Sequence, residues 1–222
     1  MKKIVGILIF AFAVVTLNAQ NEQHVYGIKS GYVEYELTGS TIGTKKIWWD
    51  NYGEQTRTEI NSTSTTKMFG IENEVVENSI IIINGDKYWA INLVDETGMT
   101  GKTNKSDASI TEGMTEAERE EYINGVMEAF GGEIIGKETI NGVVCEIFKV
   151  FGSKSWMYEG ISLKSDVSLM GIENYEMSTK FEKDITINAS QFIAPENVEY
   201  TDMDAMEKDM YNEMYEDYED DE

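Results

Sequence analysis

Residues 136–164 constrain the fold of this 222-residue chain more than any other stretch. Strand side chains alternate between two faces, so one face would carry Val144, Glu146, Phe148 and Val150 and the other Cys145, Ile147, Lys149 and Phe151. Asn141-Gly142 interrupts this alternation with a dipeptide that accepts positive φ, so it predicts a hairpin turn. Glu159-Gly160 predicts a second turn of the same kind. The stretch is therefore predicted to be a β-meander, with β-branched and aromatic residues on both faces.

The same alternation predicts further strands at 31–38, 44–50, 54–60, 75–83, 87–94, 175–182 and 184–188. Residues 67–71 are a weaker strand candidate, and the Ser/Thr-rich residues 61–66 fit either a loop or an exposed strand edge. Residues 95–113 are rich in Gly, Thr, Ser and Asp and are predicted to be a long loop. The last strand pattern closes at Pro195, because proline suits the end of a strand and not its centre.

Residues 115–130 are predicted to form the one helix of the domain. Thr115 and Glu118 have the spacing of a capping box at its start, and Gly131 supplies a left-handed stop at its end. One stripe at helical spacing is formed by Arg119, Ile123, Val126, Met127 and Phe130. We expect this amphipathic helix to lie across the open side of the sheet, with the apolar members of the stripe pointing inward.

The charge of the chain excludes several classes of function. Asp and Glu number 41 against 18 Lys and Arg, for a formal net charge of -23. Nucleic-acid binding and adsorption to anionic membranes rely on clustered cations, so neither is expected. A single Cys and a single His exclude an intrachain disulfide and a Cys₂His₂ zinc site. We expect no metal site and no cofactor, and a monomeric protein.

Residues 1–19 have the pattern of a cleaved signal peptide. Lys2 and Lys3 precede an apolar run that is short for a membrane span, and Ala19 provides a small residue at the cleavage point. The alternative is an N-terminal membrane anchor. No Cys follows the run to carry a lipid. We therefore expect a periplasmic or secreted protein, with one domain over residues 20–200.

Residues 201–222 differ in composition from the domain. They hold eleven acids against the single Lys208, and four methionines lie three or four residues apart: Met203, Met206, Met210 and Met214. The favoured interpretation is a solvated acidic tail of marginal helicity. Two alternatives are an amphipathic helix that binds a protein partner and a weak cation buffer.

No pattern of activated side chains points to an enzyme. Cys145 lies within a predicted strand and is interpreted as a buried structural thiol, and His24 as a solvated residue. Phosphate-binding, nucleophile-elbow and zinc-protease motifs are absent from the sequence. We expect no catalytic residues. Two roles fit the tryptophans, lining a ligand cleft or ordinary sheet packing: Trp48, Trp49, Trp89 and Trp156.

Five motifs, taken in their order, suggest a family. They are Gly-Tyr-Val-Glu-Tyr at 31–35, Lys-Ile-Trp-Trp-Asp-Asn-Tyr-Gly at 46–53, Gly-Lys-Glu-Thr-Ile-Asn-Gly-Val-Val-Cys at 136–145, Trp-Met-Tyr-Glu-Gly-Ile-Ser-Leu-Lys at 156–164 and Phe-Ile-Ala-Pro at 192–195. This layout resembles the superfamily of outer-membrane lipoprotein carrier proteins, in particular its secreted branch in bacteria of the Bacteroides–Flavobacterium kind. The resemblance implies an incomplete antiparallel β-barrel with helices packed into its concave side around an apolar cavity. The acidic tail and the 95–113 loop depart from the carrier pattern.

Together these observations predict a mainly β (α+β) protein, an incomplete barrel or curved sheet with one helix on its concave face. The expected function is a non-enzymatic module that binds an apolar or amphipathic ligand, such as a lipid or acyl chain. The candidate cavity residues are Trp49, Ile81, Ile83, Trp89, Ile123, Met127 and Phe130. The alternative is an envelope protein-interaction or stress-related module, with a barrel filled by its own side chains and a partner bound through the sheet edge or the acidic tail. An unknown hydrolase ranks third.

Overall fold

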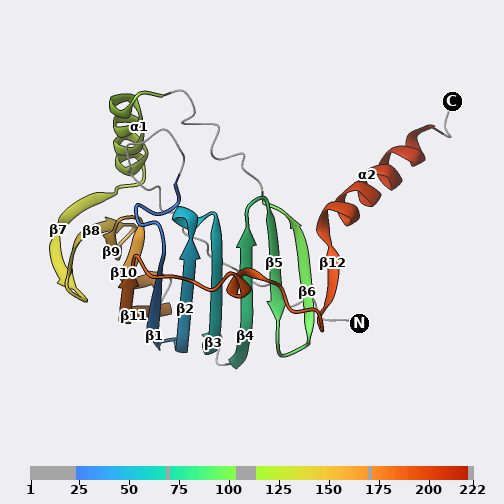
Figure 1. Cartoon of the computed structure of the whole chain (residues 1–222), viewed down its shortest axis with the longest axis horizontal. Coiled ribbons are helices and arrows are strands. Elements are labelled where there is room, and N and C mark those ends of the chain that lie inside the picture. Colours follow the sequence, from blue (N-terminus) through green and yellow to red (C-terminus); the bar gives the residue numbers. More distant parts are fainter. Residues whose placement is uncertain (1–23, 69–70, 104–113, 170–171, 220–222) are drawn as a thin grey trace.

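The computed structural model describes residues 24–68, 71–103, 114–169 and 172–219. Twelve strands form one sheet in the order β12-β6-β5-β4-β3-β2-β1-β11-β10-β9-β8-β7 (Figure 1). Their bounds are β1 Gly31–Gly39, β2 Thr41–Asp50, β3 Gln55–Met68, β4 Ile71–Asn84, β5 Lys87–Asn92, β6 Thr97–Lys102, β7 Glu133–Ile140, β8 Val143–Val150, β9 Ser153–Tyr158, β10 Ile161–Leu169, β11 Ile172–Lys183 and β12 Glu199–Asp202. Two helices, α1 Glu116–Ala129 and α2 Met203–Glu219, and two short 3₁₀ segments, η1 Asn51–Gly53 and η3 Ala189–Phe192, complete the described fold.

The prediction of a mainly β fold with an open, curved sheet is confirmed. Neighbouring strands pair antiparallel except β12, which runs parallel to β6. The predicted hairpin turns are present: Asn141 and Gly142 both have positive φ, at 49° and 82°, and join β7 to β8. Glu159 and Gly160 do the same between β9 and β10.

Two parts of the chain differ from the prediction. The Ser/Thr-rich residues 61–66 continue β3, which pairs along its whole length with β4. The predicted loop at 95–113 contains strand β6, whose small and polar residues hid its alternation; the rest of that loop, 104–113, lies outside the described residues. β6 pairs with β5 and receives β12 on its other side, so the sheet extends two strands beyond the predicted hairpin.

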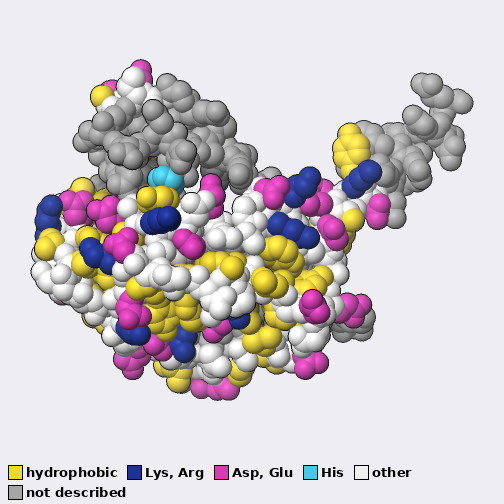
Figure 2. Space-filling view, in the orientation of Figure 1, with side chains coloured by type: hydrophobic (Ala, Val, Ile, Leu, Met, Phe, Trp, Pro, Cys, Tyr) yellow, Lys and Arg dark blue, Asp and Glu magenta, His cyan; other side chains and the backbone are white. Residues whose placement is uncertain are grey.

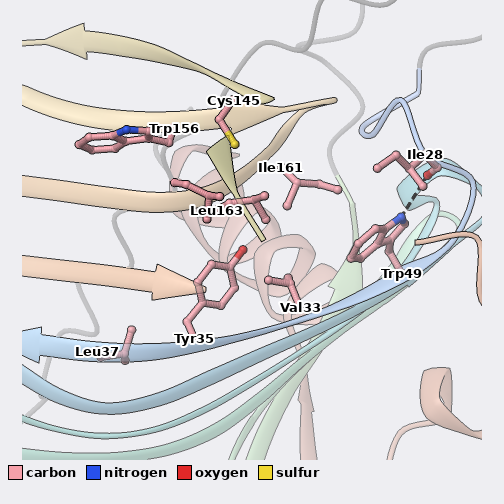
Figure 3. Packing of buried hydrophobic residues seen from close by; sticks show 10 residues of the cluster. Ile28, Val33, Tyr35, Leu37, Trp49, Cys145, Trp156, Ile161 and Leu163 are labelled. Atoms are coloured by element: carbon pink, nitrogen blue, oxygen red, sulfur yellow. Dashed lines mark hydrogen bonds between the residues drawn. The ribbon is translucent and has the colours of Figure 1, made fainter. Parts of the chain in front are cut away.

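The sheet curves around a core on its inner face (Figure 3). This inner core includes Val33 and Tyr35 from β1, Trp49 from β2, Cys145 from β8 and Leu163 from β10. Strands that lie several places apart in the sheet share this cluster, so the sheet must bend toward it. The face that carries these side chains is therefore the concave face.

The opposite, convex face carries a second core under a strap formed by residues 184–198. The strap crosses in front of β2 to β5 in Figure 1 and buries Phe192 and Val198 against Ile80, Ile82 and Ile91. Residues 184–188, predicted as a strand, are irregular, and η3 follows them. The strap is tied down at both ends and in its middle: Ser30 Oγ donates to Ile185 O (2.7 Å), Arg57 Nη1 to Gln191 O (3.3 Å) and Tyr200 OH to Pro195 O (3.0 Å).

Helix α1 has the predicted ends and a different position. Thr115 caps it through a reciprocal capping box with Glu118, and Gly131 follows with φ 64°. The helix lies beyond the strand ends, above the part of the sheet that contains β7 to β9 (Figure 1). We expected Phe130 to point inward; its side chain is 53% exposed and packs edge-to-face on Phe151. The physical reason is that side chains of the sheet itself already fill the concave face below α1.

Helix α2 is a second helix where we favoured a tail of marginal helicity. The first two tail residues, Thr201 and Asp202, end strand β12 and are part of the sheet. Asp202 Oδ1 then accepts hydrogen bonds from the backbone N–H groups of Asp204 and Ala205, at 3.0 and 3.2 Å, and so caps α2. From there the helix projects away from the sheet (Figure 1).

Candidate ligand-binding groove

A mostly apolar row, interrupted by Thr58, runs across the concave face from the inner core to β6. Cross-strand pairing links Val33, Ile47, Thr58, Ile81, Ala90 and Met99 in that order. Directly paired residues lie on the same face, so all six share the concave side. The exposed fraction rises along this row, from 0% at Val33 to 41% at Met99. The row therefore begins as closed core and ends as open surface.

A second row lies beside it, nearer the β4–β5 turn. It links Trp49, Thr56, Ile83 and Tyr88 and ends at Gly101. Trp49 is fully buried and its Nε1 donates to Ile28 O at 3.0 Å (Figure 3). Ile83 and Tyr88 are half-buried.

The open ends of both rows form a partly exposed surface on the concave side of the bent sheet. We call this surface the concave groove and define it as Ile81, Ile83, Tyr88, Ala90 and Met99. It is a shallow, mostly apolar surface on β4, β5 and β6, three strands that span about 10 Å. The first turn of α2 borders it: a side chain on Gly101 would meet both the Tyr88 ring and Asp204 Oδ1, at 3.1 and 3.2 Å. The groove thus lies between the inner core and the start of α2.

The structure brings together three of the predicted cavity residues and separates the others. Trp49, Ile81 and Ile83 share the concave face. Trp89 lies on the convex face, in a row with Trp48, and packs under the strap. Phe130 lies at the end of α1, away from the groove.

The side chains of Ile123 and Met127 lie outside the part of α1 that the structure describes. Sequence reasoning missed Tyr88, Ala90 and Met99. The tight turn between Asn84 and Lys87 fixes the register of the hairpin, so Ile83 pairs with Tyr88 and Ile81 with Ala90. Tyr88 and Ala90 therefore share the face of Ile81 and Ile83, and Trp89 lies on the opposite face. No such signal existed for Met99, because its strand was predicted to be a loop.

The buried Tyr35 and Cys145 belong to the closed inner core and not to the groove. Burial raises the pKa of the Tyr35 hydroxyl well above its usual range, and Tyr35 OH donates to Ser162 O at 2.8 Å. Burial likewise raises the pKa of the Cys145 thiol, as expected for a structural cysteine. His24 stacks on Tyr52, with ring centroids 4.0 Å apart. Among the described residues, no three His, Cys, Asp or Glu side chains gather as metal ligands would.

A hollow of about 350 Å³ lies on the convex face beside the strap. Polar side chains from β2, β3 and β4 line much of it, including Lys46, Glu59, Asn61 and Asn78. Lys46 and Glu34 form an ion pair at 3.6 Å next to this hollow. Apolar residues at its floor and rim, Ile80 and Leu93, adjoin the strap-covered core. None of the predicted cavity residues contributes to this hollow.

No family model and no curated protein matches this sequence. Among solved structures, the fold is similar to that of an uncharacterized conserved protein from Thermus thermophilus, with a TM-score of 0.50 and 7% identity over 79% of this chain and 91% of that chain. MucB is also similar, with a TM-score of 0.44 and 10% identity over 77% of this chain and 59% of that chain. At 7% identity, the likeness to the Thermus protein concerns the fold alone. None of the described helices combines the length and apolar composition needed to cross a bilayer.

Proposed function

We propose that this protein is a non-enzymatic binding module whose concave groove holds the apolar part of an amphipathic ligand, such as an acyl chain. The observation that carries the proposal is the row from Val33 to Met99, where an apolar surface continues out of the core and stays open. A half-exposed apolar surface is costly in water, at about 25 cal/mol for each Å². An apolar chain laid on Ile81, Ala90 and Met99 would remove that cost. The resemblance to lipoprotein carriers agrees with this class of ligand.

The proposed setting is the periplasm or the extracellular space. It rests on the signal-peptide pattern of residues 1–19, which lie outside the described residues. The excess of Asp and Glu over Lys and Arg argues against nucleic acid as the ligand.

The alternative is a protein-interaction module without a small ligand. It is favoured by the inner core, where ten buried side chains of the chain itself occupy the most enclosed part of the concave face. The two functions differ in what they require of the groove. A ligand-binding module needs Ala90 and Met99 to stay apolar, whereas an interaction module that works elsewhere does not.

The test is binding of N-phenyl-1-naphthylamine, a neutral probe that fluoresces in apolar sites, to mature protein. Met99→Glu places a charge in the groove and should weaken probe binding at least about tenfold, because an unpaired carboxylate on the apolar surface opposes contact with the probe. Ile42→Glu is the matched control, because Ile42 is also a partly exposed apolar residue within a strand but lies on the convex face. Equal probe affinity in both variants would show that the concave groove is not the probe-binding site and would contradict the proposal.

Native mass spectrometry of gently extracted protein supplies the natural ligand class. We expect a mass increment that matches a lipid or another acylated molecule, and its loss in Met99→Glu. An apo mass together with no probe binding would favour the interaction module.

A further inference from the structure

We infer that α2 is a docking helix for a basic, amphipathic segment of a partner protein. The docking surface is the part of α2 beyond its first turn, which borders the concave groove, and the inference does not require the proposed ligand. Residues 203–219 form a helix of about 25 Å at 1.5 Å per residue. The helix contacts β6 and β12, and Asp204 in its first turn accepts a hydrogen bond from the backbone N–H of Lys102. The rest projects from the sheet edge beside β12 (Figure 1).

The described half of α2 carries an apolar stripe in water. Met206 and Met210 are four residues apart, hence on one face, and their side chains are 47% and 58% exposed. Such a stripe on a soluble protein's helix is ordinarily covered, because an amphipathic helix gains most of its stability from burying that face.

The negative charge of residues 201–222 indicates which kind of partner covers the apolar stripe. Residues 201–222 contain eleven acids and one Lys, so they contribute -10 of the formal net charge of -23. Glu207, Lys208 and Asp209 lie within one turn of Met206 and Met210, and Figure 2 shows apolar atoms beside charged atoms of both signs on this part of α2. An anionic helix of this kind repels itself and attracts cations, so a cationic partner stabilises it. Flexible methionine side chains adapt to a partner's apolar face without a preformed pocket.

The occupant that satisfies both features is a helix with Leu-like residues on one face and Lys or Arg on the other. Purely basic segments would leave Met206 and Met210 exposed, and purely apolar segments would leave the acids unpaired. A second copy of this chain would place one anionic tail against another, which like-charge repulsion disfavours.

The test uses the full mature chain and a fluorescein-labelled 18-residue peptide of Leu and Lys in helical period, followed by anisotropy. Two control peptides carry the same number of Lys residues: an oligolysine and a Leu/Lys peptide with its period scrambled. We expect the periodic peptide to bind at least about tenfold more tightly than either control, with affinity falling as salt is raised. Binding should also raise the helical circular dichroism of the mixture above the sum of its components.

Two variants of the whole chain locate the site. Met206→Gln with Met210→Gln keeps helix propensity and charge and removes the apolar stripe, and it should weaken the periodic peptide about tenfold. Val144→Gln with Ile42→Gln removes two equally exposed apolar residues from the sheet and should leave binding unchanged. Equal binding of all three peptides, or no effect of the methionine substitutions, would overturn the inference. It would mean that α2 binds cations only through its negative charge.

Closure of α2 over its own groove is a further outcome. In that case the methionine substitutions would increase binding of the neutral naphthylamine probe in the absence of peptide. This result would also overturn the inference, since the stripe would then have an intramolecular partner.

Discussion

Replacing Trp49 with alanine is expected to cost about 3–5 kcal/mol of the free energy of unfolding. The side chain is 0% exposed and lies near Tyr26 and Phe181, with ring centroids at 5.3 and 6.3 Å. A buried tryptophan removes about 150–250 Å² from water, which at about 25 cal/mol per Å² gives about 4–6 kcal/mol as an upper limit. Alanine keeps part of that area, while the loss of the bond to Ile28 O adds about 1 kcal/mol.

The measurement is urea unfolding followed by far-ultraviolet circular dichroism, with linear extrapolation to water. Trp49→Phe keeps an apolar ring and removes the indole donor, so it should lose about 1–3 kcal/mol. Val144→Ala is the control, because Val144 is exposed on β8 and should change stability by about 0.5 kcal/mol or less. A loss of less than about 1.5 kcal/mol for Trp49→Ala would refute the conclusion that this ring closes the inner core.

Four more outcomes are expected. Gly31→Ala should destabilise strongly, by about 2 kcal/mol or more in urea melts, because its Cβ would approach Trp49 Cζ2 to 2.2 Å and no small shift relieves that contact. Phe130→Ala should cost only about 1 kcal/mol or less, since the ring is half exposed, and a loss above about 3 kcal/mol would mean that α1 packs inward after all. Cys145 should react with Ellman's reagent only at the rate of unfolding, because it is buried and its thiol pKa is raised; rapid reaction in native buffer contradicts this. Burial raises the pKa of Tyr26 to about 12, whereas a tyrosine in the unfolded chain has a pKa of about 10. The contribution of the protonated Tyr26 hydroxyl to the free energy of unfolding is therefore complete below about pH 10 and is lost as the pH rises toward 12. In Tyr26→Phe the free energy of unfolding should fall less steeply over this pH range.

Much of the local structure followed from short patterns. The Asn141-Gly142 turn, the capping box at Thr115 and the stop at Gly131 are all present, because each depends on backbone preferences within a few residues. The alternation in residues 136–164 predicted its strands for the same reason. Strand β6 escaped prediction because Thr97–Lys102 contains two glycines and one large apolar residue, too few for a period of two to appear.

The candidate site was predicted in part. Trp49, Ile81 and Ile83 lie on the concave face as a set, whereas Trp89, adjacent to the groove residues Tyr88 and Ala90 in the sequence, faces the other way. A shift of one residue along a strand moves a side chain to the opposite face. A set of apolar residues chosen without the strand register therefore contains members of both the concave and the convex core.

The sequence alone determined where most strands of the two meanders, their turns and the ends of α1 fall, since these depend on contacts between near neighbours. It also determined the anionic character of the tail, and its single Cys excludes an intrachain disulfide. Tertiary structure decided which way the sheet bends and which face stays open. Those features depend on pairing between β1 and β11, between β6 and β12, and on the strap that returns over β2 to β5. Such contacts join residues about a hundred or more positions apart, and no local pattern encodes which distant segment covers which face, because many segments are apolar enough to do so.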